Sequence, residues 1–220
     1  MPWVLLIVAS YLAGSIPFGL LLARVIRGID IRQEGSGNIG ATNVSRSLGK
    51  KWGLVVLVLD ALKGYLPPLF LPGIVGLGGD TGPAGAWVIP MSAMTTVIGH
   101  MFPIWLGFKG GKGIATSLGA LGAASPWGLL VATICFFGSF AINKIVSLSS
   151  LIALAGYLAF ELICWQVPFA FRQSDGLQGA TTPQAIMAVV LSILIVYRHK
   201  SNLARLRAGT EPTFFQKKTN

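Results

Sequence analysis

The sequence has little charge for its length. Of its 220 residues, 11% are Asp, Glu, Lys or Arg, and 53% are hydrophobic. A soluble domain contains about 25% charged residues, so this chain lacks the side chains that would cover a water-exposed surface. The composition excludes a soluble enzyme or binding domain and predicts a protein that passes through a membrane several times.

Cysteine and histidine are also scarce. Cys135 and Cys164 lie in apolar runs, where cysteine is typically a small buried hydrophobic residue. His100 and His199 have no metal-ligand spacing around them, so we expect no metal and no cofactor. The net charge of +10 does not indicate nucleic-acid binding, because the basic residues lie beside apolar runs and report membrane topology.

Long apolar runs are abundant. Six of them contain at most two Asp, Glu, Lys, Arg or His residues each: residues 2–23, 52–72, 81–108, 113–143, 145–171 and 177–197. Runs of about 20 apolar residues are typical of transmembrane helices. The first run is not a signal peptide, because its basic residues follow it; the same order predicts that the N-terminus is outside.

Residues 113–143 decide the topology. As one helix they would be about 46 Å long, against about 30 Å of hydrocarbon, and they contain a Ser125-Pro126 break. Two short helices would place 15 Lys and Arg residues on the inner face, whereas one helix would place nine there. The positive-inside bias therefore predicts an all-α integral membrane protein with seven transmembrane helices, the C-terminus in the cytosol, and short fourth and fifth helices. If these two short helices formed a re-entrant pair, the C-terminal tail would lie on the same side of the membrane.

The first of three unusual polar segments is GSGNIGATNVSR, residues 35–46. Its glycines let backbone N–H groups approach an anion, and the guanidinium of Arg46 suits a phosphate. The other candidate phosphate ligands in this segment are Ser36, Gly37, Asn38, Thr42 and Asn43. The alternative interpretation is a flexible polar loop.

The second and third segments lie later in the chain. In FKGGKGIAT, residues 108–116, a glycine-rich turn precedes an apolar helix, and a helix N-terminus is a ready anion site. Its candidates are Lys109, Gly110, Gly111, Lys112 and Gly113, with a plain connecting turn as the alternative. After the last apolar run, residues 197–211 include His199 and Asn202, which share a face if they are helical; a positive-inside anchor is the alternative there.

Four acidic or basic residues lie inside apolar runs: Asp60, Lys63, His100 and Glu161. Asp60 and Lys63 are three residues apart, which favours an intrahelical ion pair that supports the site, because an unpaired charge in a membrane is costly. The alternative for this pair is a proton or substrate pathway. His100 is expected to form a structural hydrogen bond near the inner surface, and the alternative is a direct role at the site. The role of Glu161 is left open.

In their order and spacing, these segments resemble the acyl-phosphate:glycerol-3-phosphate acyltransferase family over nearly the whole chain. The resemblance also covers Gly14-Ser15-Ile16-Pro17, residues 60–64 and RHKSNLARLRAGTE at residues 198–211. It implies one domain over residues 1–220 in a bacterial inner membrane, with motif loops 24–51, 107–113 and 198–220 facing the cytosol. The implied reaction moves a fatty acyl group from acyl phosphate to the 1-hydroxyl of sn-glycerol 3-phosphate, as the first committed step of phospholipid synthesis.

The resemblance also implies roles for individual residues. Ser36, Arg46, His199 and Asn202 would be catalytic, residues 110–113 would bind phosphate, and Glu211 would be structural. The proton acceptor stays open between His199 and a substrate phosphate. The expected partners are the two substrates and the bilayer, and docking of a soluble acyl-phosphate synthase is left open.

Two other classes of function agree less well with the residues. A transporter of phosphorylated solutes would place its polar groups near the bilayer midplane, whereas most of them here lie at one face. A lipid phosphatase or phosphatidyl-alcohol transferase would need clustered carboxylates, which the sequence lacks. The residues therefore favour an enzyme.

Overall fold

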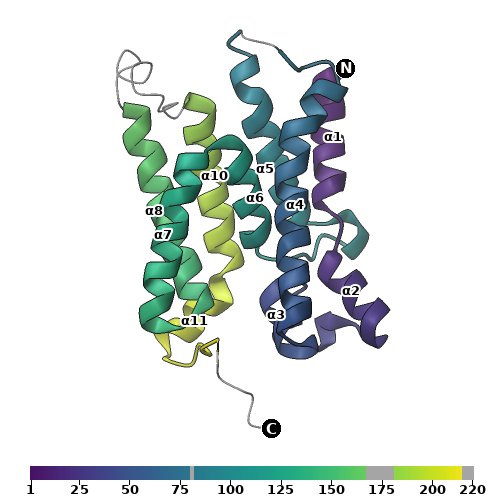
Figure 1. Cartoon of the computed structure of the whole chain (residues 1–220), viewed down its shortest axis with the longest axis vertical. Coiled ribbons are helices and arrows are strands. Elements are labelled where there is room, and N and C mark those ends of the chain that lie inside the picture. The colour runs from purple at the N-terminus through teal and green to yellow at the C-terminus, as the bar shows by residue number, and fades with distance from the viewer. Residues whose placement is uncertain (80–81, 167–180, 215–220) are drawn as a thin grey trace. The chain divides into compact units, whose positions relative to one another are not determined.

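The computed structural model describes residues 1–79, 82–166 and 181–214, and Figure 1 shows the course of the chain. These residues form helices and turns and contain no strand, which confirms the all-α prediction. Contacts divide the chain into two compact units, Met1–Ala124 and Ser125–Asn220. The single domain expected over residues 1–220 stays a prediction.

The first unit contains the helices that carry the first two polar segments. Its α-helices are α1 (Pro2–Gly14), α2 (Phe18–Arg27), α3 (Ala41–Leu48), α4 (Lys50–Ile74), α5 (Val88–Met101) and α6 (Ile114–Ala124). Three short 3-10 turns connect them: η1 (Ile31–Gln33), η2 (Gly85–Trp87) and η3 (Ile104–Leu106).

The second unit carries the third polar segment. Its described helices are α7 (Pro126–Asn143), α8 (Val146–Gln166), α10 (Thr182–Arg198) and α11 (Lys200–Arg207). The capping box of Thr181 and Gln184 begins α10, because each side chain bonds the other residue's backbone N–H.

Five described helical segments are long and apolar enough to cross a membrane: Pro2–Arg27, Lys50–Ile74, Gly85–Leu106, Pro126–Asn143 and Val146–Gln166. Helices α10 and α11 meet the same criterion together, with a bend of 61° between them. Helix α6 has 11 residues, about 16 Å, and is shorter than the hydrocarbon layer. Seven crossings and their orientation stay predictions.

The break within residues 113–143 is confirmed. Helix α6 ends at Ala124, and α7 begins at Pro126, where proline is favourable because the first helical N–H has no intrahelical acceptor. The Ser125 hydroxyl caps α7 by accepting the Gly128 N–H at 3.3 Å. The predicted short fourth and fifth helices correspond to α6 and α7. Helix α7 has 18 residues and is a candidate span, so a short fifth helix is not confirmed.

Glycines allow two helix pairs of the first unit to approach closely. A Cβ added at Gly64 would lie 2.0 Å from the Thr116 carbonyl oxygen, and one at Gly119 would lie 1.8 Å from that of Ala61. The α1–α5 contact is similar, with Gly14 against Thr96. In a membrane, where lipid competes equally for apolar side chains, such backbone proximity is a main source of helix association.

A small hydrophobic core holds the first polar segment against the helices. Ile39 and Val44 belong to it, and the carbonyl oxygen of Ile39 lies against Gly19 of α2. The buried members are Leu20, Ala23, Ile31, Ile39, Val44, Leu48 and Val56. The connection between α2 and α3 is thus anchored by apolar contacts on both sides of its polar residues.

We expect Gly119→Ala to lower the stability of the protein by about 1–3 kcal/mol, the usual cost of overpacking. Its new methyl group would have to displace the backbone of α4. Gly73→Ala on α4 is the control, because no atom lies within 4 Å of a Cβ there. Thermal unfolding in detergent measures both, and equal midpoints for the two variants would contradict the close α4–α6 contact.

Candidate active site

The Asn43 amide organises the first polar segment. Its Nδ2 donates to the carbonyl oxygens of Ile31 at 3.1 Å, Glu34 at 3.0 Å and Asn38 at 2.8 Å, and its Oδ1 accepts the Ser36 N–H at 2.8 Å. Asn43 is 2% exposed. One buried side chain therefore satisfies backbone groups on both sides of Ser36, as a buried loop requires.

This geometry corrects the role predicted for Asn43. Both N–H groups of its amide already donate to carbonyl oxygens of the loop, so the side chain shapes the loop and has no donor left for phosphate. Asn38 is partly used in the same way, because its Oδ1 accepts the Gly40 N–H at 2.8 Å in front of α3. Gly35 has a φ of 58°, and a Cβ there would lie 2.2 Å from Asn43 Oδ1.

Three further candidate residues of this segment, Ser36, Thr42 and Arg46, are not buried. Ser36 and Arg46 are exposed and Thr42 is half-buried. Thr42 and Arg46 are four residues apart on α3 and therefore lie on one side of that helix. Gly37 has a φ of 70°, so it turns the chain directly after Ser36. The Asn43 bonds thus present a hydroxyl and a guanidinium at the edge of a fixed loop.

Asp30 fixes the start of the same loop. Its carboxylate accepts the Arg32 Nε–H at 2.9 Å and the Arg32 backbone N–H at 3.0 Å, which caps η1. The hydrogen bond from the Arg32 side chain, followed by that from its backbone, lowers the pKa of Asp30 to about 2. This capping role was not among the predictions from the sequence, although an Asp side chain commonly accepts the backbone N–H two residues later.

The glycine-rich turn of the second segment folds back over the end of α5. The Gly110 N–H donates to the Met101 carbonyl and the Gly111 N–H to the His100 carbonyl, each at 3.1 Å. A Cβ at Gly111 would lie 2.1 Å from His100 Nε2. Gly113, with a φ of 84°, then turns the chain into α6.

These bonds reduce the number of candidate phosphate ligands in the second segment. The N–H groups of Gly110 and Gly111 serve α5 carbonyls, so these two glycines allow close packing and do not point N–H groups at an anion. The candidates that stay are Lys109, which is exposed, Lys112, which is half-buried, and Gly113 at the N-terminus of α6. A helix N-terminus still favours an anion at that position.

Asp60, Lys63 and His100 form a buried polar group behind this turn. Lys63 Nζ lies 2.9 Å from Asp60 Oδ1, which confirms the predicted intrahelical ion pair. The same ammonium donates to the Ile16 carbonyl at 2.6 Å and lies over the Phe18 ring. His100 Nδ1 is 3.7 Å from Asp60 Oδ1. One end of this group, Lys63, bonds the break between α1 and α2, and the other end, the His100 ring, packs against Gly111.

In the second unit, His199 lies at the bend between α10 and α11. Its Nδ1 is 2.8 Å from the Ile195 carbonyl oxygen. A carbonyl only accepts, so Nδ1 carries the proton and Nε2 has the lone pair in the neutral ring. In this tautomer Nε2 can accept a hydrogen bond or a proton. A group that takes up a proton or orients a substrate hydroxyl needs such an acceptor.

Glu211 ties the third segment together. Its carboxylate accepts the Ser147 hydroxyl at 2.6 Å, the Asn202 Nδ2 at 2.5 Å and the Arg205 Nε at 2.6 Å. Burial alone would raise its pKa, but these three hydrogen bonds and the Arg205 charge lower the pKa below its ordinary value. These bonds fit the structural role expected for Glu211, and they orient Asn202, whose Oδ1 is buried with no partner among the described residues.

Glu161 lies near Tyr157 of its own helix and near the start of α7. A Cβ at Gly128 would lie 2.6 Å from Glu161 Oε1, 2.7 Å from Ser125 Oγ and 2.7 Å from Tyr157 Cε2. Three side chains therefore converge on the first turn of α7, where the positive end of the helix favours a carboxyl oxygen. This position gives Glu161 a structural role at the Ser125 break.

Comparison with known proteins places these features in a family. A model of the glycerol-3-phosphate acyltransferase family matches residues 4–209. The glycerol-3-phosphate acyltransferase of Anaeromyxobacter dehalogenans (strain 2CP-1 / ATCC BAA-258) is 42% identical over 207 residues, which are 94% of each chain.

Two solved structures are also similar. The glycerol 3-phosphate form of PlsY (YgiH), an integral membrane glycerol 3-phosphate acyltransferase, superposes with a TM-score of 0.80 at 37% identity and covers 96% of this chain and 98% of PlsY. Its lysophosphatidic acid form gives a TM-score of 0.77 at 38% identity, over 94% and 93% of the two chains.

The matches extend over both units, and the helices are those of an integral membrane protein, so the chain is an integral membrane acyltransferase. It belongs to the glycerol-3-phosphate acyltransferase family, the family of PlsY. The predicted family is thereby confirmed.

Glu211 should stabilise the protein in a pH-dependent way. Its pKa is lowered on folding, so its stabilisation is fully present above the unfolded-state pKa, near 4.3, and is lost as the pH falls through the folded-state value. We expect Glu211→Gln to unfold at a lower temperature than the wild type at pH 7, and the gap to shrink below pH 4. Glu34→Gln, at an exposed position, is the control; a gap that does not change with pH would contradict this role.

Proposed function

We propose that the chain transfers a fatty acyl group from acyl phosphate to the 1-hydroxyl of sn-glycerol 3-phosphate. The hydroxyl oxygen attacks the acyl carbon, the bond from that carbon to the phosphate oxygen breaks, and inorganic phosphate leaves. The products are 1-acyl-sn-glycerol 3-phosphate and phosphate. The PlsY structures in glycerol 3-phosphate and lysophosphatidic acid forms support the acceptor and the product.

The observation that carries this proposal is the loop held by Asn43. The bond that Asn43 accepts from the Ser36 N–H ties the backbone of the exposed Ser36 to α3, the helix that carries the half-buried Thr42 and the exposed Arg46. Two hydroxyls and a guanidinium are suitable ligands for a phosphate. In the proposed reaction Ser36 and Arg46 contact substrate directly. Asn43 positions them and does not touch the substrate.

Charge repulsion is the main barrier that these residues must lower. Two phosphates have to approach one carbonyl carbon, and unit charges about 5 Å apart repel by roughly 3 kcal/mol at an effective dielectric constant of 20. For two dianions this grows about fourfold, to roughly 13 kcal/mol. We assign the compensation to Arg46, Lys112 and Lys109, with Gly113 at the start of α6. Holding the two substrates in place beside each other also raises the rate of the acyl transfer.

We further propose that a phosphate oxygen of the substrates accepts the hydroxyl proton. A phosphoryl group has a second pKa of about 6, so it can hold the proton without help from a carboxylate. His199 then orients a substrate through Nε2, and Asn202, held by Glu211, has the same orienting role.

The location follows from the family and the distribution of charge. We place the protein in the bacterial cytoplasmic membrane, with the three polar segments facing the cytosol, because basic segments stay inside. Acyl phosphate is a reactive mixed anhydride, so we also propose that a soluble acyl-phosphate synthase supplies it at that face.

The acyl donor and Arg46 are tested together. Purified protein in lipid should form lysophosphatidic acid from palmitoyl phosphate and glycerol 3-phosphate, and should not use palmitoyl-CoA. Arg46→Ala should lower kcat/KM at least about 100-fold, the scale of a lost charge-stabilising contact, whereas the exposed Arg27→Ala on α2 should stay close to the wild type. Equal use of the thioester, or no turnover in a folded sample, would contradict the proposal.

Substitution of His199 tests the route of the proton. If substrate phosphate accepts it, His199→Ala should keep more than about a tenth of kcat, because loss of a general base costs roughly 10²–10⁴-fold. Steady-state kinetics from pH 5.5 to 8.5 give kcat and its pH profile. A 100-fold loss of kcat, together with disappearance of a pH dependence near 6.5, would assign the base to His199 instead.

A further inference from the structure

The loop between α5 and the glycine-rich turn, residues 102–109, contains a strained backbone. Phe108 has a φ of 62°, and Gly107 before it has a φ of 56°. A left-handed conformation is uncommon for a residue other than glycine, and it persists only where the surroundings impose it. Lys109 follows directly, so its position depends on the contacts that hold this backbone in place.

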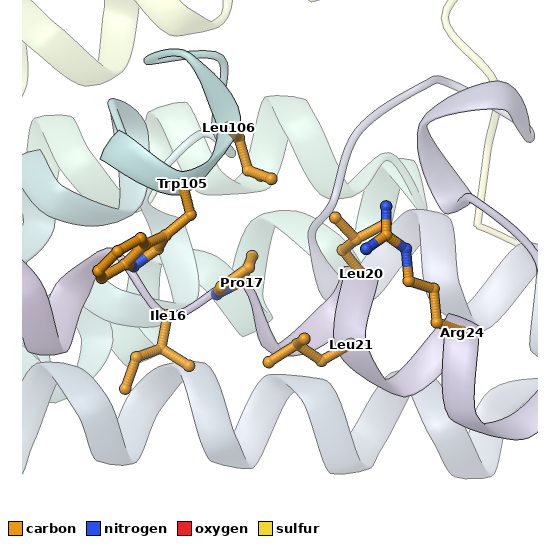
Figure 2. A pocket seen from close by; sticks show the side chains of 7 residues that line it. All are labelled: Ile16, Pro17, Leu20, Leu21, Arg24, Trp105 and Leu106. Carbon is orange, nitrogen blue, oxygen red and sulfur yellow. The ribbon is translucent and has the colours of Figure 1, made fainter.

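Apolar packing supplies only part of those contacts. Ile104, Trp105 and Phe108 are 47%, 60% and 57% exposed. Figure 2 shows Trp105 and Leu106 of η3 on one side of an open pocket of about 350 Å³, with the break between α1 and α2 on the other side. Leu106 packs against the small hydrophobic core. With this much open surface around it, the loop depends on the hydrogen bonds at its two ends.

Both ends of the loop are bonded beside the C-terminus of α5, where carbonyl groups lack a partner within the helix. At the returning end, the N–H groups of Gly110 and Gly111 donate to α5 carbonyl groups. At the outgoing end, the Tyr11 hydroxyl of α1 donates to the Phe102 carbonyl at 2.7 Å. Phe102 is the first residue after α5, so Tyr11 fixes the point at which the chain leaves that helix.

Tyr11 is itself firmly placed. Its carbonyl oxygen accepts the Ser15 backbone N–H at 2.9 Å and the Ser15 hydroxyl at 2.8 Å, where α1 ends. The same oxygen lies against Gly99 of α5, at which a Cβ would be 2.3 Å away. The Tyr11 hydroxyl therefore reaches the loop from a backbone that is packed on α5.

We propose that Tyr11 is a positioning residue for the acyl transfer. It does not touch substrate; its hydroxyl keeps the strained loop in one conformation, and through the loop it sets the turn that carries Lys109 and Lys112. Charged groups that are fixed before the reaction stabilise a transition state without the cost of rearranging them. This inference rests on the proposed function, in which these two lysines offset phosphate charge, and adds the residue that orients them.

A double-mutant cycle tests whether Tyr11 acts through the turn. Tyr11→Phe removes one oxygen atom and should lower kcat/KM with palmitoyl phosphate and glycerol 3-phosphate about five- to tenfold, the upper range for one lost hydrogen bond. In a Lys112→Gln background the same substitution should lower kcat/KM less than about twofold, because residues that act through a shared contact are not additive.

Tyr65→Phe is the matched control, since it removes a hydroxyl from an exposed position on α4. It should leave kcat/KM at the starting value in both backgrounds. If Tyr11→Phe lowered kcat/KM by the same factor in both backgrounds, Tyr11 would act only on general stability. That result, or no effect in either background, would overturn the proposal.

Hydrogen exchange separates this inference from the proposed function, because it does not depend on turnover. In lipid nanodiscs, Tyr11→Phe should speed exchange at least about tenfold in the peptide spanning residues 102–112 and leave α4 protected, whereas Tyr65→Phe should change neither. Faster exchange in that peptide with no turnover by the wild type would reject the acyltransferase proposal and retain Tyr11 as the anchor of the loop. Unchanged exchange there, or faster exchange throughout the first unit, would reject the anchor.

Discussion

The side-chain amide of Asn43 is the interaction on which the candidate active site most depends. A loop of small polar residues has no helix or sheet to satisfy its backbone groups, so it keeps one shape only when a side chain bonds them. Asn43 bonds carbonyl groups before and after Ser36 and also the Ser36 N–H. Because Asn43 is on α3, four backbone groups of the loop are tied to the helix that carries Arg46.

The glycine-rich turn is held by a different principle, close packing against a buried ring. In an apolar layer an unpaired charge is costly. Asp60, Lys63 and His100 lower this cost by lying near one another, and the Lys63 ammonium also donates to the Ile16 carbonyl. The group makes a polar connection through the first unit, from the interrupted helix to Gly111. The position of the turn thus depends on the buried polar group against which it packs.

The sequence predicted the large features because they depend on local pattern. Apolar runs gave the helices, the Ser125-Pro126 pair gave the break after α6, and a separation of three residues gave the Asp60–Lys63 ion pair. It could not separate loop-forming residues from ligand-binding ones. An Asn that bonds loop carbonyls and an Asn that faces a ligand are the same letter in a sequence. A glycine, which has no Cβ, can leave room for a phosphate, but Gly111 leaves room for the His100 ring instead. The bond from Tyr11 to Phe102 joins residues 91 positions apart, which no local pattern reports.

Hydrogen exchange in the first polar segment tests the central claim most directly, namely that Asn43 fixes the loop that presents Ser36 and Arg46. In lipid nanodiscs, Asn43→Ala should speed exchange at least about tenfold in residues 31–46, leave α4 and α6 protected, and lower kcat/KM with glycerol 3-phosphate. Faster exchange throughout the first unit would mean general unfolding. Unchanged exchange in residues 31–46, with activity retained, would contradict the account.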